Sequence, residues 1–281
     1  MIAATEIFCL NELGKRPNNE DCVSPEKGTA TVKDRLFIVC DGVGGENKGE
    51  VASEIICTSI QTFIKKENLQ AGTETETIKR AIQYANEKLV AHSAADREAK
   101  RMSTTLSLVL LGEQSVLSAW CGDTRIHHIR GGKIMWKSQD HSLVGELIRQ
   151  GELTEEEARS HPKRNVITRS LNAFDANNEV EFHEINDFET GDYLLLCTDG
   201  FLEKVTQEVI YKVLMVEREK DKAKLFLAHC DGVTRDNFSM YLIKGKCFPG
   251  KRRASIPRIA LILSILFLLI GVLIIVWFYA R

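Results

Sequence analysis

Short apolar runs, rich in β-branched residues, alternate with longer segments of helical periodicity over residues 1–246. The apolar runs predict strands at about 5–10, 35–40, 104–111, 115–121, 125–130, 179–185, 193–198 and 238–243. The helical periodicity covers about 48–66, 74–99, 143–150, 206–216 and 219–229. Gly131-Gly132 follows a central run and favours a β-hairpin. Because the strands cluster centrally and the helices come in pairs, we expect an α+β sandwich rather than a Rossmann-type sheet.

The end of the chain follows a different pattern. Residues 259–280, IALILSILFLLIGVLIIVWFYA, carry no charged residue, and roughly 22 residues at ~1.5 Å each span a bilayer core. Basic residues precede this segment and Arg281 alone follows it, which predicts that residues 1–250 lie in the cytoplasm. The alternative is a buried core helix, but this segment is apolar on every face. We therefore expect a soluble domain at 1–246, a basic juxtamembrane linker at 247–258 and a single membrane anchor at 259–280.

The distribution of charged residues also divides the chain near residue 247. The formal charge is −2, with 37 basic and 39 acidic residues, but five basic residues and no acidic ones lie from Cys247 onward. Residues 1–246 therefore carry 32 basic against 39 acidic side chains, a net charge of −7. A net negative charge on residues 1–246 argues against nucleic acid as a partner, because binding to phosphate backbones requires clustered Lys and Arg. The N-terminus lacks a basic segment followed by a long apolar core, so we expect no secretory signal.

The eight cysteines are scattered, without a CxxC pair or zinc-ligand spacing. Several lie inside apolar runs, where a free cysteine behaves as a small buried hydrophobe. We expect them to be reduced, which implies a reducing compartment. Cys40 and Cys197 lie beside acidic residues, but neither belongs to the Cys-x₅-Arg loop that a cysteine phosphatase would use.

The stretch CDGVGG at residues 40–45 first suggests a phosphate-binding glycine turn. It matches neither GxGxxG nor a P-loop, which makes a nucleotide site a weak interpretation. Asp41 instead ends a buried-looking strand, and the glycines allow the backbone to turn tightly beside its carboxylate.

Further acidic residues stand at strand ends or in turns: Glu20 and Asp21, Asp123, Asp199 and Asp236. Any one of them alone could be a turn residue that caps backbone amides. Together, and without accompanying His or Cys, they predict an all-oxygen site for a hard divalent cation such as Mg²⁺ or Mn²⁺.

These segments carry a resemblance. The order RPNNED, CDGVGG, STTL, CGDTR, DHS, ITRSL, CTDGF and TRDN resembles the PPM/PP2C family of metal-dependent serine/threonine phosphatases, from about residue 5 to 244. The bacterial branch fits better, because Val43 stands where many eukaryotic members have His. Residues 143–170 also resemble the mobile bacterial flap, in which Thr154 before Glu155–Glu157 predicts a capped helix start.

The resemblance implies a four-layer α-β-β-α sandwich with a dinuclear metal centre at one end. Asp41 would bridge two Mg²⁺ or Mn²⁺ ions, with Glu20 and the Gly42 carbonyl on one ion. Asp199 and Asp236 would hold the other ion, and Asp123 with Asp199 would hold a weaker third one. Asp21 would orient water or a ligand behind them, and Arg16 would bind the phosphate. Two such cations activate a bridging water for in-line attack on phosphorus.

Three positions depart from the family pattern. Val43 cannot donate a proton to the leaving alkoxide, so the acid is either water or another group. His141 in DHS is the nearest candidate by motif, and the alternative there is a structural turn. Glu203 replaces an aspartate, and Thr124 replaces a common serine.

The sequence therefore predicts a protein phosphatase anchored at the cytoplasmic face of a membrane. Its expected partners are proteins phosphorylated on serine or threonine and a cognate Ser/Thr kinase. Two other functions stay open: a pseudophosphatase that binds phosphoproteins as a membrane scaffold, and a small-phosphoester hydrolase.

Overall fold

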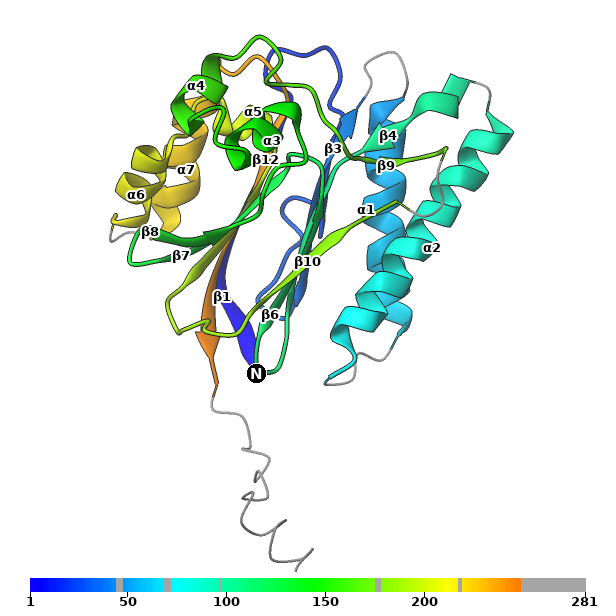
Figure 1. Ribbon diagram of the computed structural model, residues 1–281. Helices are drawn as coiled ribbons and strands as arrows, with labels where there is room; N and C mark the ends of the chain where they lie inside the picture. Colours follow the sequence, from blue (N-terminus) through cyan, green and yellow to red (C-terminus); the bar gives the residue numbers. More distant parts are fainter. Residues whose placement is uncertain (44–47, 68–71, 97, 175–177, 217–218, 249–281) are drawn as a thin grey trace, which may run out of the picture. The chain divides into compact units, whose positions relative to one another are not determined.

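The structure, a computed structural model, describes residues 1–43, 48–67, 72–96, 98–174, 178–216 and 219–248. Two β-sheets lie face to face, with helices on both outer faces (Figure 1). The expected α-β-β-α sandwich is therefore confirmed for these residues.

The five-stranded sheet has the order β1-β12-β11-β7-β8 and is antiparallel throughout. Its strands are β1 (Ile2–Glu12), β12 (Phe238–Cys247), β11 (Tyr193–Cys197), β7 (Arg125–Arg130) and β8 (Lys133–Lys137). The predicted hairpin joins β7 to β8: Gly131 and Gly132 have φ of 55° and 77°, the left-handed backbone that glycine adopts readily.

The seven-stranded sheet has the order β10-β6-β5-β3-β4-β9, with β2 paired to β3 beside that path. Its strands are β10 (Glu181–Ile185), β6 (Val116–Cys121), β5 (Leu106–Leu111), β3 (Leu36–Val43), β4 (Ser103–Thr104), β9 (Leu171–Asn172) and β2 (Asp21–Ser24). The central strands β5 and β6 are buried along their whole length, because both faces of this sheet are covered.

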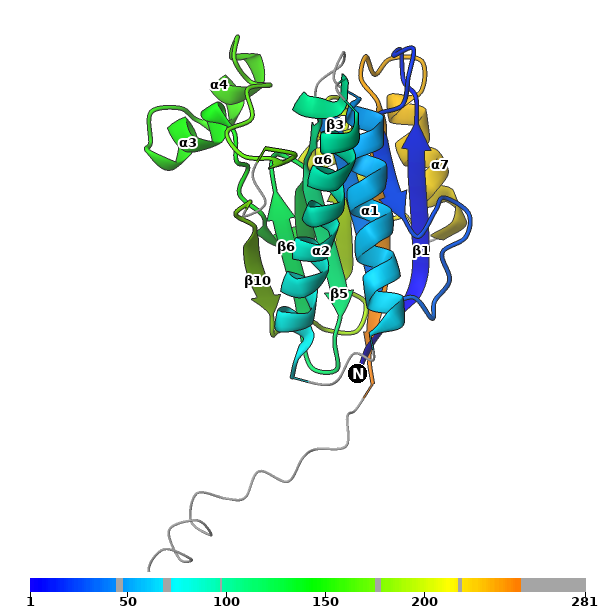
Figure 2. The ribbon, with the colours of Figure 1, turned by 90° about the vertical axis from the view of Figure 1, so that its right-hand side faces the viewer.

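Helices cover the outer faces in two groups, which Figure 1 shows on opposite sides and Figure 2 shows from the side of α1 and α2. The helices are α1 (Gly49–Lys66), α2 (Glu74–Ala95), η2 (Glu98–Arg101), α3 (Leu143–Arg149), α4 (Glu155–Ser160), α5 (Asp199–Leu202), α6 (Gln207–Leu214) and α7 (Glu219–Cys230). Helix α4 begins with the predicted cap, in which Thr154 and Glu157 bond each other's backbone amides.

Three apolar cores hold these layers together. Ile56 of α1 and Ile78 of α2 pack on the outer face of the larger sheet, in a core that includes Leu108. A second core fills the space between the sheets, and a third lies between the smaller sheet and helices α5–α7. Alternate strand residues point to opposite cores, so each sheet is fixed on both faces.

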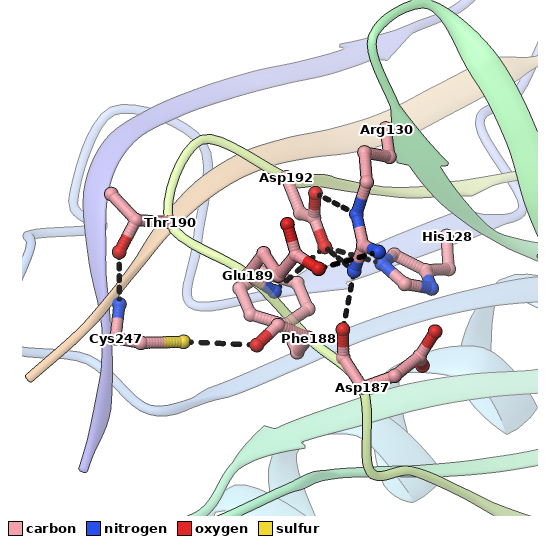
Figure 3. A network of polar contacts seen from close by, with 8 residues as sticks. All are labelled: His128, Arg130, Asp187, Phe188, Glu189, Thr190, Asp192 and Cys247. Carbon is pink, nitrogen blue, oxygen red and sulfur yellow. Dashed lines mark hydrogen bonds and ion pairs between the residues drawn. The ribbon is translucent and has the colours of Figure 1, made fainter.

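A polar network lies at the end of the smaller sheet that is nearer the N-terminus (Figure 3). The buried Asp192 carboxylate binds His128 at 2.7 Å and Arg130 at 2.8 and 2.9 Å. Beside it, the Thr190 hydroxyl accepts a hydrogen bond from the Cys247 amide at 3.0 Å. The loop between β10 and β11 is thereby fastened to β7 and to the last residue of β12.

The last strand is longer than predicted. Strand β12 continues to Cys247, and Phe248 N donates to the Met1 carbonyl, so the sheet includes the start of the predicted linker. Within the described residues, no helix is both long and apolar enough to cross a membrane. The predicted anchor, residues 259–280, lies outside those residues and stays a prediction.

Candidate active site

The site is built where β3 ends against the first turn of α1. Asp41 follows the buried run 37–40 of β3, and Gly42 lies against Gly49 of α1. A Cβ on Gly42 would come within 2.3 Å of the Gly49 carbonyl group, so only glycine fits between strand and helix. The Glu20 carbonyl accepts hydrogen bonds from Gly42 N at 3.0 Å and from the Ser53 hydroxyl at 2.6 Å. These contacts bring Glu20, Asp41 and Gly42 together.

Asp21 joins the two sheets at the same end. It is paired with Asp41 across β2 and β3, and only 7% of it is exposed. The Thr198 hydroxyl at the end of β11 donates to its carboxylate at 3.1 Å and accepts from Ser239 N at 3.0 Å. Asp21 therefore lies between the strand ends of both sheets, behind Asp41.

Asp199 and Asp236 come from neighbouring segments of the smaller sheet. Asp199 begins α5 directly after β11, and Asp236 precedes β12. A Cβ on Gly200 would lie 2.0 Å from the Asn237 carbonyl oxygen, so these two segments are in close contact. Arg16 Nη2 donates to Asp236 Oδ2 at 2.8 Å, which makes the predicted phosphate-binding arginine an ion-pair partner of a predicted metal ligand.

Asn237 holds the Arg16 loop in place. Its Nδ2 donates to the carbonyls of Leu13 and Asn18 at 2.8 and 2.9 Å, and its Oδ1 accepts from Glu20 N at 2.9 Å. Asn237 belongs to the TRDN segment, and the sequence alone predicts no role for it. Its signal in the sequence is only its position beside Asp236, because an amide that bonds distant backbone groups follows no local spacing.

Asp123 reaches the site through a chain of hydroxyl groups. Thr105 Oγ1 accepts from Asp41 N at 2.9 Å and shares a hydrogen bond with the hydroxyl of Thr124. Thr124 directly follows Asp123, in the turn between β6 and β7. The structure thus brings Asp123 to the same end of the sandwich as Asp41, and it explains the hydroxyl residue at position 124.

The carboxyl groups of this end perturb one another. Burial raises the pKa of Asp41 well above its usual range, and the charges of Asp21, Asp199 and Asp123 raise it further. Burial and Asp199 likewise raise the pKa of Asp123, and burial and Asp236 raise that of Asp199. Crowded, partly buried acids of this kind gain most from a cation that neutralises their charge.

The donor set suits a hard cation, although it is not drawn together into a single binding cluster. In the described part of the chain, no three acidic, imidazole or thiol side chains form a group arranged to hold a metal ion. The donors that gather at this end are carboxylates and a backbone carbonyl, which are the ligands preferred by Mg²⁺ and Mn²⁺. In chemical type, therefore, the residues present fit the expected cation.

Three other candidates for chemistry, one histidine and two cysteines, are excluded by burial. His141 is 2% exposed; its Nδ1 accepts from Gly122 N at 3.1 Å, and its Nε2 contacts Glu181 at 3.0 Å. Burial lowers the pKa of His141, and neither ring nitrogen faces solvent to serve a substrate. Burial raises the pKa of the Cys40 and Cys197 thiols, which keeps them protonated and poorly nucleophilic at neutral pH.

Glu203 acts on the backbone beside the site. One of its carboxylate oxygens accepts a hydrogen bond from Arg235 N at 3.0 Å, one residue before Asp236. The longer side chain at this position therefore supports the loop that carries Asp236.

Comparison with known proteins gives a consistent result. The family model for protein phosphatase 2C matches residues 17–227. The serine/threonine phosphatase stp of Listeria innocua is 31% identical over 246 residues, which cover 85% of this chain and 95% of that protein. The crystal structure of Stp1 from Staphylococcus aureus is 29% identical, with a TM-score of 0.76 over 85% of this chain and 94% of that chain.

A further solved structure shares the fold alone. The catalytic domain of the serine/threonine protein phosphatase PstP, in complex with 2 manganese ions, is 24% identical with a TM-score of 0.71, over 88% of this chain and all of that chain. The family match covers most of the described residues, including Glu20, Asp41, Asp123 and Asp199 of the carboxylate site, whereas Asp236 lies beyond its end. The chain therefore belongs to the protein phosphatase 2C family and is a protein-serine/threonine phosphatase.

Proposed function

We propose that this phosphatase depends on Mg²⁺ or Mn²⁺ held by Glu20, Asp41, the Gly42 carbonyl, Asp199 and Asp236. Asp123 would contribute to a weaker third site. The observation that carries the proposal is the gathering of Asp41, Asp123 and Asp199 at one end of the sandwich, where burial and neighbouring carboxylates raise the pKa of each. The manganese in the PstP structure supports the same chemistry.

Bound cations supply the positive charge that lowers the pKa of water toward neutrality and stabilises the transferring phosphoryl group. Side chains of the protein orient and bind the phosphate. Asp21, bonded to the Thr198 hydroxyl, stands behind the ligands and orients what binds there. The Arg16 side chain is 53% exposed beside Asp236, where its fork of donors can meet a phosphate dianion. Because the Val43 side chain has no ionisable proton and His141 is enclosed, we assign protonation of the leaving alkoxide to solvent water.

The substrates are phosphorylated proteins, because the enzyme is a protein-serine/threonine phosphatase. A cognate Ser/Thr kinase follows from this activity, because some enzyme must install the groups that this one removes. We propose that such substrates lie at the cytoplasmic face of a membrane. The basis is the uncharged segment 259–280 and its basic flank from Lys251 to Arg258.

The proposal is tested by turnover of a phosphothreonine peptide and of p-nitrophenyl phosphate, in Mg²⁺, in Mn²⁺ and in EDTA. We expect peptide hydrolysis to require the metal and to survive alkylation of exposed thiols. Full activity in EDTA would contradict the cation site. Turnover of p-nitrophenyl phosphate without any turnover of the peptide would favour the small-phosphoester hydrolase. No turnover of either substrate, with phosphopeptide binding retained, would favour the pseudophosphatase.

A further inference from the structure

His141 lies outside the proposed ligand set, yet its side chain is fixed from both sides. Gly122 N donates to Nδ1 at 3.1 Å, so Nδ1 carries no proton and the neutral ring must carry it on Nε2. Nε2 then donates to Glu181 at 3.0 Å. The Trp120 ring stacks against the imidazole, with centroids 6.3 Å apart and planes inclined by 17°. The orientation and the tautomer of this histidine are therefore both determined.

The backbone of His141 repeats the contact with the same turn. His141 N donates to the Gly122 carbonyl at 2.9 Å, so the two residues exchange a pair of hydrogen bonds. The His141 carbonyl accepts from Thr168 N at 2.8 Å. Glu181, the partner of Nε2, also contacts Arg169 at 3.4 Å. His141 thus connects the turn after β6 to the far end of the segment that contains α3 and α4.

The turn at Gly122, to which His141 is bonded, has a backbone conformation and a close contact that favour glycine. Gly122 has φ of 102°, and a Cβ there would lie 2.6 Å from the Thr105 side chain. Its amide and carbonyl both bond to His141, so the direction in which the chain enters Asp123 depends on that pair of bonds. On the other side, Thr124 is bonded to Thr105, whose hydroxyl accepts from Asp41 N. Asp123 is therefore held between two fixed neighbours.

We infer that His141 is a positioning residue of this phosphatase: its ring fixes the Gly122–Asp123 turn and thereby the place of the Asp123 carboxylate in the site. It does not touch substrate, because its ring is enclosed and both nitrogens are bonded. This inference rests on the proposed role of Asp123 in the reaction.

The two ring nitrogens can be tested separately. In His141→Asn, the side-chain oxygen replaces Nδ1 and can accept from Gly122 N, whereas the contact with Glu181 is lost. In His141→Gln, the longer amide can reach Glu181 but places no acceptor at the position of Nδ1. His141→Ala removes both contacts. All three variants are made in the full-length protein and compared with wild type.

The first measurement is hydrogen exchange of the Gly122 amide in metal-free protein, which reports the bond without reference to activity. We expect protection in His141→Asn and its loss in His141→Gln and His141→Ala. The second measurement is phosphopeptide turnover in saturating Mn²⁺. We expect kcat to fall by about tenfold or more in His141→Gln and His141→Ala, with KM nearly unchanged and kcat largely retained in His141→Asn.

His128 provides a matched control. It too is buried and bonded to a carboxylate, but it lies in the network of Figure 3, at the other end of the smaller sheet. His128→Gln and His128→Ala should lower the melting temperature while leaving kcat and Gly122 protection unchanged. A loss of kcat that follows the melting temperature across both histidines would overturn the positioning role.

Further outcomes also test the inference about His141. Rescue by Gln as complete as rescue by Asn would overturn the inference, as would an Asn variant as inactive as Ala, which is the result expected of a proton donor. The parallel variant Asp123→Ala distinguishes a failure of the proposed role of Asp123 from a failure of the inference about His141. If it keeps wild-type kcat, the proposed role of Asp123 fails and the inference falls with it. If it is impaired while the His141 variants are not, only the inference about His141 is wrong.

Discussion

Asp21 shows at the scale of one residue how burial of like charges shapes this site. It is a carboxyl group enclosed between two sheets, and burial together with the charges of Asp199 and Asp236 raises its pKa to about 8, although the nearby Ser239 and Thr198 side chains lower it. The folded protein therefore holds a proton on Asp21 at pH values where the unfolded chain has released it.

The pH dependence of stability follows from that difference. The folded-state pKa is above the unfolded one, so the stabilisation is fully present below about pH 4 and is lost as the pH rises through about 8. In metal-free protein, the free energy of unfolding should therefore fall as the pH rises within that window, because the folded state still binds the proton that the unfolded chain has released. Denaturant unfolding in EDTA at several pH values, for wild type and Asp21→Asn, measures it. If the free energy of unfolding depended on pH in the same way in the two proteins, the raised pKa of Asp21 would be contradicted.

The charged residues of the site could be predicted from the sequence, whereas the neutral ones could not. Asp41, Asp123, Asp199 and Asp236 could be predicted because each follows or precedes an apolar run, and the structure brings them to one end of the sandwich. Asn237 and Thr105 could not, because their importance lies in backbone groups more than 60 positions away. A neutral side chain becomes recognisable only when its partners are placed in space.

At the scale of elements, the contact between β3 and α1 decides where Asp41 and Glu20 lie. Strand and helix meet at Gly42 and Gly49, and each would clash with the other if either carried a Cβ. The Glu20 carbonyl is bonded to both elements, through Gly42 N and the Ser53 hydroxyl. Displacement of one element would therefore move two proposed ligands at once.

Gly42→Ala tests this contact. The added methyl group must separate β3 from α1, so we expect a loss of stability of ~1–3 kcal/mol or more and a large loss of kcat. Gly131→Ala is the control, because a Cβ there meets nothing within 4 Å and costs only the left-handed backbone, roughly 1–2 kcal/mol. Its kcat should be unchanged. Equal kcat in the two variants would show that the contact does not position the site.

Long elements were predictable, and short ones were not. The periodic segments at 48–66 and 74–99 became α1, and α2 with η2, because an amphipathic pattern persists over several turns. Strands β2 and β9 have four and two residues, too few for alternation to be visible. They exist because β3 and β4 offer them an edge to pair with, which is a tertiary cause.

At the scale of the whole molecule, the last strand separates the phosphatase domain from the proposed anchor. Because β12 continues to Cys247 and Phe248 bonds the Met1 carbonyl, a truncation that spares the sheet must end after Phe248. Such a truncation also keeps every proposed ligand, the last of which is Asp236.

We expect the full-length protein to sediment with membranes and to resist extraction by high salt or carbonate. The basic flank contributes only about 1 kcal/mol per residue near an anionic surface, and salt screens it, whereas the apolar segment is insensitive to salt. The chain truncated after Phe248 should be soluble with wild-type kcat. Protease should degrade the domain in sealed inverted vesicles and spare it in intact cells. The reverse pattern would contradict the cytoplasmic orientation and separate the enzyme from cytoplasmic phosphoproteins.

If the carboxylates at this end of the sandwich hold the cations on which hydrolysis depends, Asp41→Asn tests that role most directly. The variant keeps the size of the side chain and removes its charge, and Asp34→Asn, at a half-buried turn residue bonded to Thr31, is the control. We predict that Asp41→Asn lowers kcat for a phosphothreonine peptide in saturating Mn²⁺ by more than tenfold, at least ~1.4 kcal/mol in the barrier, while Asp34→Asn does not. An Asp41→Asn enzyme that keeps more than about a tenth of the wild-type kcat would contradict the account.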